Sequence, residues 1–122
     1  MASVNIIIKG DKNMIWNDIH LNPSVEVYNE FGWGKPQYAV DSDGFVHLRG
    51  LIKNNGGTEQ TILAFNLGEG LRPSKNVMFQ AIAEYTPYRL DVAPNGDVLL
   101  RAFEQGLGHD WINLNGVYFH AS

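Results

Sequence analysis

The chain has no cysteine among its 122 residues, so disulfide bonds and thiolate metal sites are excluded. Charged residues make up only 18% of the sequence, below the usual quarter, and we expect a surface rich in neutral polar side chains. The formal net charge is −4. This charge argues against non-specific binding to nucleic acid or to anionic membranes, because both require a positive field.

Long hydrophobic runs and recognisable enzyme motifs are also missing. The apolar stretch Val4–Ile8 is too short to span a bilayer, and no basic region followed by a long apolar run marks a signal peptide. We therefore expect no membrane insertion and no signal-directed export. The sequence contains no nucleophile elbow, P-loop or dinucleotide fingerprint.

The stretch from Asp41 to Asn54 carries the clearest structural pattern. Asp41-Ser-Asp-Gly44 predicts a tight turn, because Asp and Ser bond the local backbone and Gly accepts positive φ. The next residues, 45–52, alternate between apolar and polar, which predicts a strand with one face on a core. Gly50 lies within it and indicates a bulge or the close approach of another backbone. His47 is expected on the outer face, where an oligomer interface or a neighbouring layer would cover it.

Short strands are predicted along the rest of the chain, at residues 3–9, 25–28, 37–40, 61–67, 77–84, 88–92, 98–103, 111–114 and 117–120. Asn95-Gly96 predicts a type I′ hairpin, in which both central residues take positive φ. The last two strands are expected to pair with each other across Asn115-Gly116. Short strands at this spacing predict a single all-β domain over residues 1–122. We expect an antiparallel β-sandwich, jelly-roll-like, of about nine or ten strands.

The first 15 residues are expected to form an N-terminal strand and a contact segment between subunits. Ile6, Ile7 and Ile8 break the apolar–polar alternation, which is typical of a strand covered on both faces. In a small domain another copy of the chain could supply the second cover. We therefore predict an oligomer interface at these three residues, together with His47.

Candidate catalytic and metal-binding groups do not form a recognisable pattern. Asp41-x-Asp43-Gly44 begins like a calcium loop, but the remaining ligands of an EF-hand are absent, and a polar turn is the better interpretation. The four histidines form no i, i+4 pair typical of zinc ligands on a helix. A glycosidase requires two carboxylates at a fixed separation, and the sequence does not establish such a pair. We expect no enzymatic activity, no metal and no cofactor.

Aromatic residues near loops are better candidates, because flat rings stack on the apolar faces of sugars. The alternative for each ring is packing in the core or at an interface. A glycine-rich loop at residues 106–110 is a further candidate, since loops on a rigid scaffold often carry binding. The predicted ligand-contacting residues are Trp33, Tyr38, Tyr85, Tyr88 and His109. Trp16 and Trp111 are interpreted as core anchors.

Several segments, taken in order, resemble the C-terminal head domain of bacteriophage tail fibre and baseplate receptor-binding proteins. The resemblance extends from about Trp16 to the C-terminus and rests on Tyr38-x-x-Asp41, Asp43–Lys53, Gly70–Lys75, Val92–Val98 and Trp111–Phe119. The chain departs from the family at Leu67-Gly68-Glu69, where the family tends to have a Leu-Pro pair before its Gly-x-Arg-Pro turn.

The resemblance implies a β-sandwich head, usually a homotrimer, at the tip of a phage tail. Such heads recognise cell-wall saccharides or teichoic acids without cleaving them, and they assemble with other tail or baseplate proteins. Membership would place the chain in the virion, after synthesis in the host cytoplasm without a signal peptide. Two alternatives stay open: a purely structural tail or fibre assembly module, and a small polysaccharide-degrading enzyme or its accessory binding module.

Overall fold

The computed structural model describes residues 14–28, 30–55, 61–84, 87–102 and 111–122. These residues form eleven strands, which are β1 (Asn17–Asp18), β2 (Val25–Val27), β3 (Gln37–Val40), β4 (Phe45–Arg49), β5 (Leu51–Asn54), β6 (Thr61–Asn66), β7 (Val77–Ala81), β8 (Tyr88–Val92), β9 (Asp97–Ala102), β10 (Trp111–Asn113) and β11 (Tyr118–His120). The predicted strand at residues 3–9 lies outside the described part of the chain. No helix long and apolar enough to cross a bilayer occurs among the described residues.

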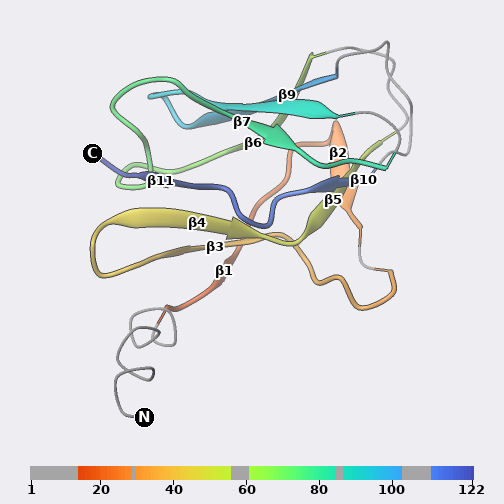
Figure 1. Ribbon diagram of the computed structural model, residues 1–122, viewed down its shortest axis with the longest axis horizontal. Helices are drawn as coiled ribbons and strands as arrows, with labels where there is room; N and C mark the ends of the chain where they lie inside the picture. The colour runs from red at the N-terminus through yellow and green to blue at the C-terminus, as the bar shows by residue number, and fades with distance from the viewer. Residues whose placement is uncertain (1–13, 29, 56–60, 85–86, 103–110) are drawn as a thin grey trace.

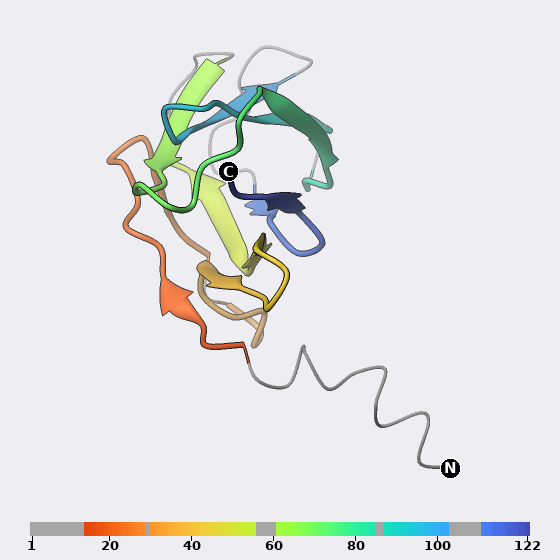
Figure 2. The ribbon, with the colours of Figure 1, turned by 90° about the vertical axis from the view of Figure 1, so that its left-hand side faces the viewer.

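The strands form three antiparallel sheets, ordered β1-β3-β4-β11, β10-β5-β2 and β6-β9-β8-β7. The third sheet lies over the other two (Figure 1), and residues from all three sheets form the hydrophobic core. The same ribbon turned by 90° shows the third sheet facing the other two across the interior of the domain (Figure 2). The predicted all-β, antiparallel sandwich is therefore confirmed, although the described strands already exceed the expected number.

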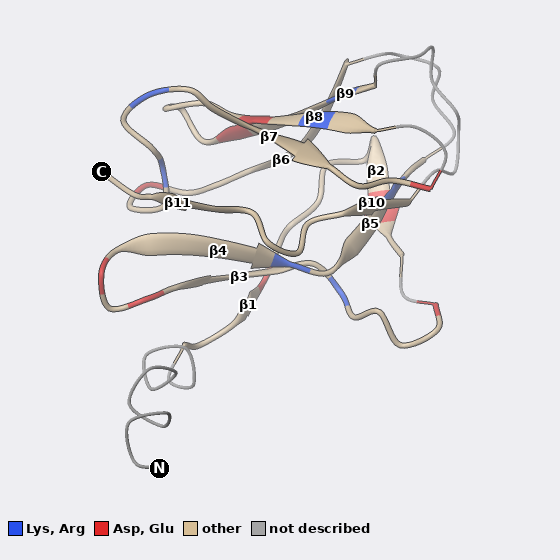
Figure 3. Ribbon diagram, in the orientation of Figure 1, with Lys and Arg blue, Asp and Glu red and all other residues tan. Residues whose placement is uncertain are grey.

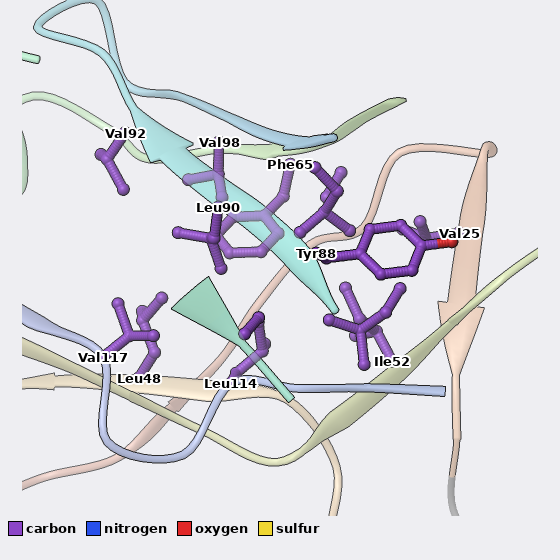
Figure 4. Close-up of a cluster of buried hydrophobic side chains, with 14 of the residues drawn as sticks. Val25, Leu48, Ile52, Phe65, Tyr88, Leu90, Val92, Val98, Leu114 and Val117 are labelled. Carbon is purple, nitrogen blue, oxygen red and sulfur yellow. The ribbon is translucent and has the colours of Figure 1, made fainter. Parts of the chain in front are cut away.

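Strand β8 illustrates how the sequence alternation creates the core. Tyr88, Leu90 and Val92 are fully buried, whereas Arg89 and Asp91 between them lie on the outer face. The buried side chains of β8 point toward Leu114 and Ile52 of the opposite layer (Figure 4). Burying each large apolar side chain contributes about 1.5–3 kcal/mol relative to its exposure to water.

The third sheet is a Greek key. Strands β7, β8 and β9 are joined as consecutive antiparallel neighbours, and β6 lies beside β9, which is the four-strand arrangement of that motif. Two isolated bridges, Leu21↔Phe65 and Ala83↔Ile112, connect this sheet to segments of the other layer. These connections hold the two layers together beyond the contacts of the core.

Gly50 divides the predicted strand at residues 45–52 into β4 and β5, which belong to different sheets. Its φ is +97°, and a Cβ atom there would overlap the backbone carbonyl of Lys35. The predicted close approach of another backbone is therefore confirmed. The break also resets the alternation, so Leu51 and Ile52 are both buried, whereas uninterrupted alternation would have placed Leu51 outward.

The hairpin between β8 and β9 is confirmed, but its predicted turn type is wrong. The amide of Gly96 donates to the carbonyl of Ala93 at 2.8 Å, and Gly96 has φ +93° while Asn95 is not among the positive-φ residues. A type I′ turn needs positive φ at both central positions. The arrangement instead matches a type I turn followed by a left-handed glycine, and Pro94 suits the first central position of such a turn.

The predicted pairing of the last two strands with each other is also wrong. Strand β10 pairs with β5, and β11 pairs with β4. The Asn115-Gly116 segment joins them without reversing the chain: Asn113 lies opposite Leu51, and five residues later Tyr118 lies opposite His47. The segment is therefore an irregularity between β10 and β11, in which five residues span the length of four on the partner strands.

Replacing Gly50 with Ala should destabilise the protein strongly, because the new Cβ meets the backbone of Lys35 in addition to the unfavourable positive φ. Gly116 is the matched control, since it has φ +88° but open space around its Cβ position. We expect Gly116→Ala to cost about 1–2 kcal/mol and Gly50→Ala at least about 2 kcal/mol more. Denaturant unfolding measures both, and equal losses would contradict the close backbone contact.

Candidate functional site: a groove around Trp33

The loop between β2 and β3 presents two aromatic rings to solvent. Phe31 is 86% exposed and Trp33 is 60% exposed. Phe31 has φ +58°, and Gly32 and Gly34 also have positive φ. A non-glycine residue in this region costs about 1–3 kcal/mol and persists only where the surroundings impose it. The loop therefore holds its exposed rings in a strained backbone, a feature that motivates a functional hypothesis.

Trp33 lies between two adjoining cavities, and Asn115 lines both of them. The first has a volume of about 220 Å³ and is lined by Trp33, Leu51, Ile82, Trp111, Asn113 and Asn115. The second has a volume of about 340 Å³ and is lined by Trp33, Gly34, Lys35, Gln37, Arg49, Gly50 and Asn115. We call the two together the Trp33 groove, with an aromatic end and a basic end.

Two asparagines fix the wall of the aromatic end. Asn113 accepts hydrogen bonds at Oδ1 from the backbone amide of Asn115 at 2.8 Å and from its side-chain Nδ2 at 2.7 Å. Asn115 in turn accepts at Oδ1 from the backbone amide of Gly50 at 3.2 Å. These bonds connect the irregular segment between β10 and β11 to the break between β4 and β5, and they orient both amides beside Trp33.

The basic end holds two cations near the bend of the sheet (Figure 3). The guanidinium carbon of Arg49 lies 4.0 Å from the ring centroid of Trp16, in a cation–π contact. Its Nε and Nη2 donate to Oε1 of Gln37 at 3.0 and 2.7 Å. Lys35 Nζ lies 3.1 Å from Asp18 Oδ2. Hydrogen bonds from Gln37 and then Lys35 hold the pKa of Asp18 below its usual range.

Among the predicted ligand-contacting residues, Trp33 occupies the exposed loop position that its role requires. Tyr88 lies beside a loop as predicted, at the start of β8, but its side chain is fully buried, so the exposure that its predicted ligand contact requires is wrong. Tyr38 is half-buried and packs against the core. Tyr85 and His109 lie outside the described residues, as do the predicted interface residues Ile6, Ile7 and Ile8.

The other two tryptophans were both predicted as core anchors, and both lie at the surface instead. Trp111 is half-buried and lines the groove, while Trp16 is half-buried beneath Arg49. The sequence analysis missed Asn113, Asn115 and Arg49 as site residues. The one feature of the sequence that could have pointed to them is Gly50. It indicates a close backbone approach but does not identify the segments that meet there.

His47 belongs to a separate cluster on the outer face of the first sheet. Its ring stacks on Tyr118 at 5.6 Å, and Phe45 contacts Tyr118 and His120 at 5.9 and 5.1 Å between centroids. Nε2 of His47 lies 2.8 Å from Oδ2 of Asp41. The structure thus places His47 on the predicted outer face, and its oligomer contact stays a prediction.

Asp41 also completes the predicted polar turn. Its Oδ1 accepts from the backbone amides of Asp43 and Phe45 at 2.9 and 3.0 Å. The hydrogen bond with His47, followed by the one from the Phe45 amide, holds the pKa of Asp41 below its usual range. The carboxylate is therefore engaged by the protein itself.

The Trp33 groove combines apolar rings, amide groups and cations within one depression. Aromatic faces pack against the apolar faces of sugar rings, while amide groups supply orientation. No Asp or Glu is found among the described residues that line either cavity. The arrangement is suited to holding a polar ring-containing ligand.

No protein-family model matches this sequence, and no curated protein matches it. Among solved structures, the chain is similar to the receptor binding protein (gp15) of Listeria phage PSA, with a TM-score of 0.71 and 12% sequence identity. The match covers 99% of this chain and 77% of that one. At this identity the likeness establishes a shared fold, and it extends over essentially the whole chain.

Removing the imidazole of His47 should raise the pKa of Asp41 toward its ordinary value, since that hydrogen bond is the largest cause of the lowering. A lowered folded-state pKa means that ionised Asp41 stabilises the fold above its unfolded pKa of about 3.9 and that this contribution is lost as the pH falls through the folded-state value. His47→Ala should therefore lose less stability on acidification. NMR titration of the Asp41 carboxyl carbon checks this, with Tyr118→Ala as a control that spares the hydrogen bond; an identical titration in His47→Ala would contradict it.

Proposed function

We propose that this chain is a receptor-binding β-domain of a bacteriophage tail, which attaches to a saccharide of the host cell surface through the Trp33 groove. The observation that carries the proposal is the exposed Trp33 between two cavities, with a second indole and two oriented amides beside it. The likeness to the phage receptor binding protein supports the biological setting. The proposed location is the tail tip in the virion.

The proposed interaction is non-covalent and involves no cleavage. Glycoside hydrolysis by the common mechanisms needs a pair of carboxylates across the scissile bond. The described lining of the groove offers indole, amide, guanidinium and ammonium groups and no carboxylate. This composition supports binding over the alternative of a polysaccharide-degrading enzyme.

Multivalency would convert a weak single contact into firm attachment. Trp33 is 60% exposed at the groove, and we expect a single sugar contact there to be weak. Several copies on one particle raise the effective concentration at a repeating polymer and increase the overall avidity. We therefore propose that the domain acts as a homo-oligomer, with a trimer favoured by the family resemblance, next to other tail or baseplate proteins.

Trp33→Ala should weaken binding to bacterial cells by about tenfold or more, because a central aromatic anchor is worth about 2 kcal/mol or more. The measurement is the decoration of a panel of whole bacterial cells, and of their purified cell walls, by fluorescently labelled protein. Met78→Ala is the matched control, since Met78 is 65% exposed on the outer face of the third sheet.

Binding to cells that survives Trp33→Ala unchanged would contradict the assignment of the groove. A wild-type oligomer that binds no cell or cell wall in the panel, and yet assembles with other tail proteins, would favour the purely structural module. Both variants should stay folded, because the side chains removed are exposed and contribute little to the core. A loss of binding can then be attributed to the groove.

A further inference from the structure

The two ends of the Trp33 groove differ in charge, and this difference narrows the class of ligand. The aromatic end is neutral and combines two indoles with two amides. The basic end contains Lys35 and Arg49. Because both cavities share Trp33 and Asn115, a single ligand can occupy both ends at once.

The side-chain hydrogen-bond acceptors that line the groove are largely occupied by other groups of the protein. Oδ1 of Asn113 accepts two hydrogen bonds from Asn115, and Oε1 of Gln37 accepts two from Arg49. An amide oxygen has two lone pairs, so both oxygens are saturated. Oδ1 of Asn115 already accepts from Gly50. The groups left for a ligand are mainly N–H donors, including Nδ2 of Asn113, and they select a ligand rich in acceptors.

The cations of the basic end are not equally neutralised. Lys35 pairs with Asp18 at 3.1 Å, and Asp18 is ionised at neutral pH like an ordinary aspartate, with its pKa lowered further by Gln37 and Lys35. Arg49 forms no salt bridge with any carboxylate in the described part of the chain. It is therefore the uncompensated positive charge of the groove, in a protein whose formal net charge is −4.

Arg49 is also held in one orientation. Trp16 contacts its guanidinium plane at 4.0 Å, and Gln37 binds Nε and one hydrogen of Nη2. The edge formed by Nη1 and the second hydrogen of Nη2 remains, and two adjacent donors of a guanidinium match the geometry of carboxylate or phosphate oxygens. A fixed side chain loses less entropy when it binds a ligand.

We propose that Arg49 is a specificity-determining residue that makes the groove select a saccharide with an anionic group next to a neutral ring. The neutral ring packs on Trp33, and the anionic group lies at Arg49 with Lys35 nearby. A sugar carboxylate and a phosphate group share this chemistry. This inference rests on the proposed saccharide binding, but the anion subsite itself can be measured separately.

The first test is an NMR titration of ¹⁵N-labelled protein with sodium phosphate and with sodium acetate, each compared with sodium chloride at matched ionic strength. We expect saturable shifts of the Arg49 Nε–H signal and of the Gly50 amide with at least one of the two anions. The anion that binds more tightly distinguishes a phosphate from a carboxylate source. Shifts no larger than those in chloride would overturn the proposal.

Arg49→Gln should weaken this anion binding about tenfold, in keeping with the loss of a charge-assisted contact of about 1.4 kcal/mol. Arg101→Gln is the matched control, because Arg101 binds Asp91 on the outer face of the third sheet. If Arg49→Gln alters the overall spectrum, Lys35→Gln provides the second variant and should weaken binding in the same direction. Equal anion affinity in the wild type and a folded Arg49→Gln variant would overturn the proposal.

The second test separates this inference from the proposed function. Raising sodium chloride should weaken the binding of wild-type protein to cell walls, and Arg49→Gln should remove most of that salt dependence. Cell-wall binding that depends on Trp33 but not on salt or Arg49 would overturn the anionic selectivity and leave saccharide binding intact. If anions shift the NMR signal of Arg49 but no cell binding depends on Trp33, the proposed function would be overturned instead.

Discussion

The close contact between the backbones of Gly50 and Lys35 is the constraint on which the rest of this structure depends. Only a residue without a side chain leaves room for the Lys35 carbonyl at position 50, where φ is +97°. The contact ends β4, turns the chain into β5 and so directs consecutive residues of one strand into two sheets. At the same point the Gly50 amide donates to Asn115, and the Leu114 amide donates to the Gly50 carbonyl at 2.9 Å.

That contact also builds the groove, because it brings three distant segments together. The loop carrying Trp33 and Lys35 lies against the break, Arg49 immediately precedes it, and Asn115 is bonded to it. The polar side chains are held before any ligand arrives, through the asparagine pair at one end and the contacts of Arg49 with Trp16 and Gln37 at the other. Such preorganisation reduces the entropic cost of binding.

Patterns within short stretches of sequence predicted where several strands lie and where two backbones approach each other. Alternation located β4, the short strands predicted at residues 37–40 and 88–92 match β3 and β8, and the position of Gly50 within the alternating strand predicted a close backbone approach. The same patterns did not reveal strand partners, since pairing of β10 with β5 and of β11 with β4 joins residues far apart in sequence. The sequence therefore did not predict that Trp111 and Asn113 line the groove. The strand at residues 88–92 was predicted with the bounds that β8 has, but alternation does not show which face of a strand is covered, so the ring of Tyr88 was assigned to the surface although it lies in the core.

The most direct test of the account uses the indole N–H signals of the three tryptophans in an NMR spectrum, during titration with soluble fragments of a cell wall that the protein binds. Trp33 and Trp111 line the aromatic end of the groove, and Trp16 lies behind Arg49. A ligand bound in the Trp33 groove should shift the signals of Trp33 and Trp111 together, and both shifts should saturate. Fragments that bind while these two signals stay unchanged, with shifts confined to residues around Met78 on the third sheet, would contradict binding in the groove.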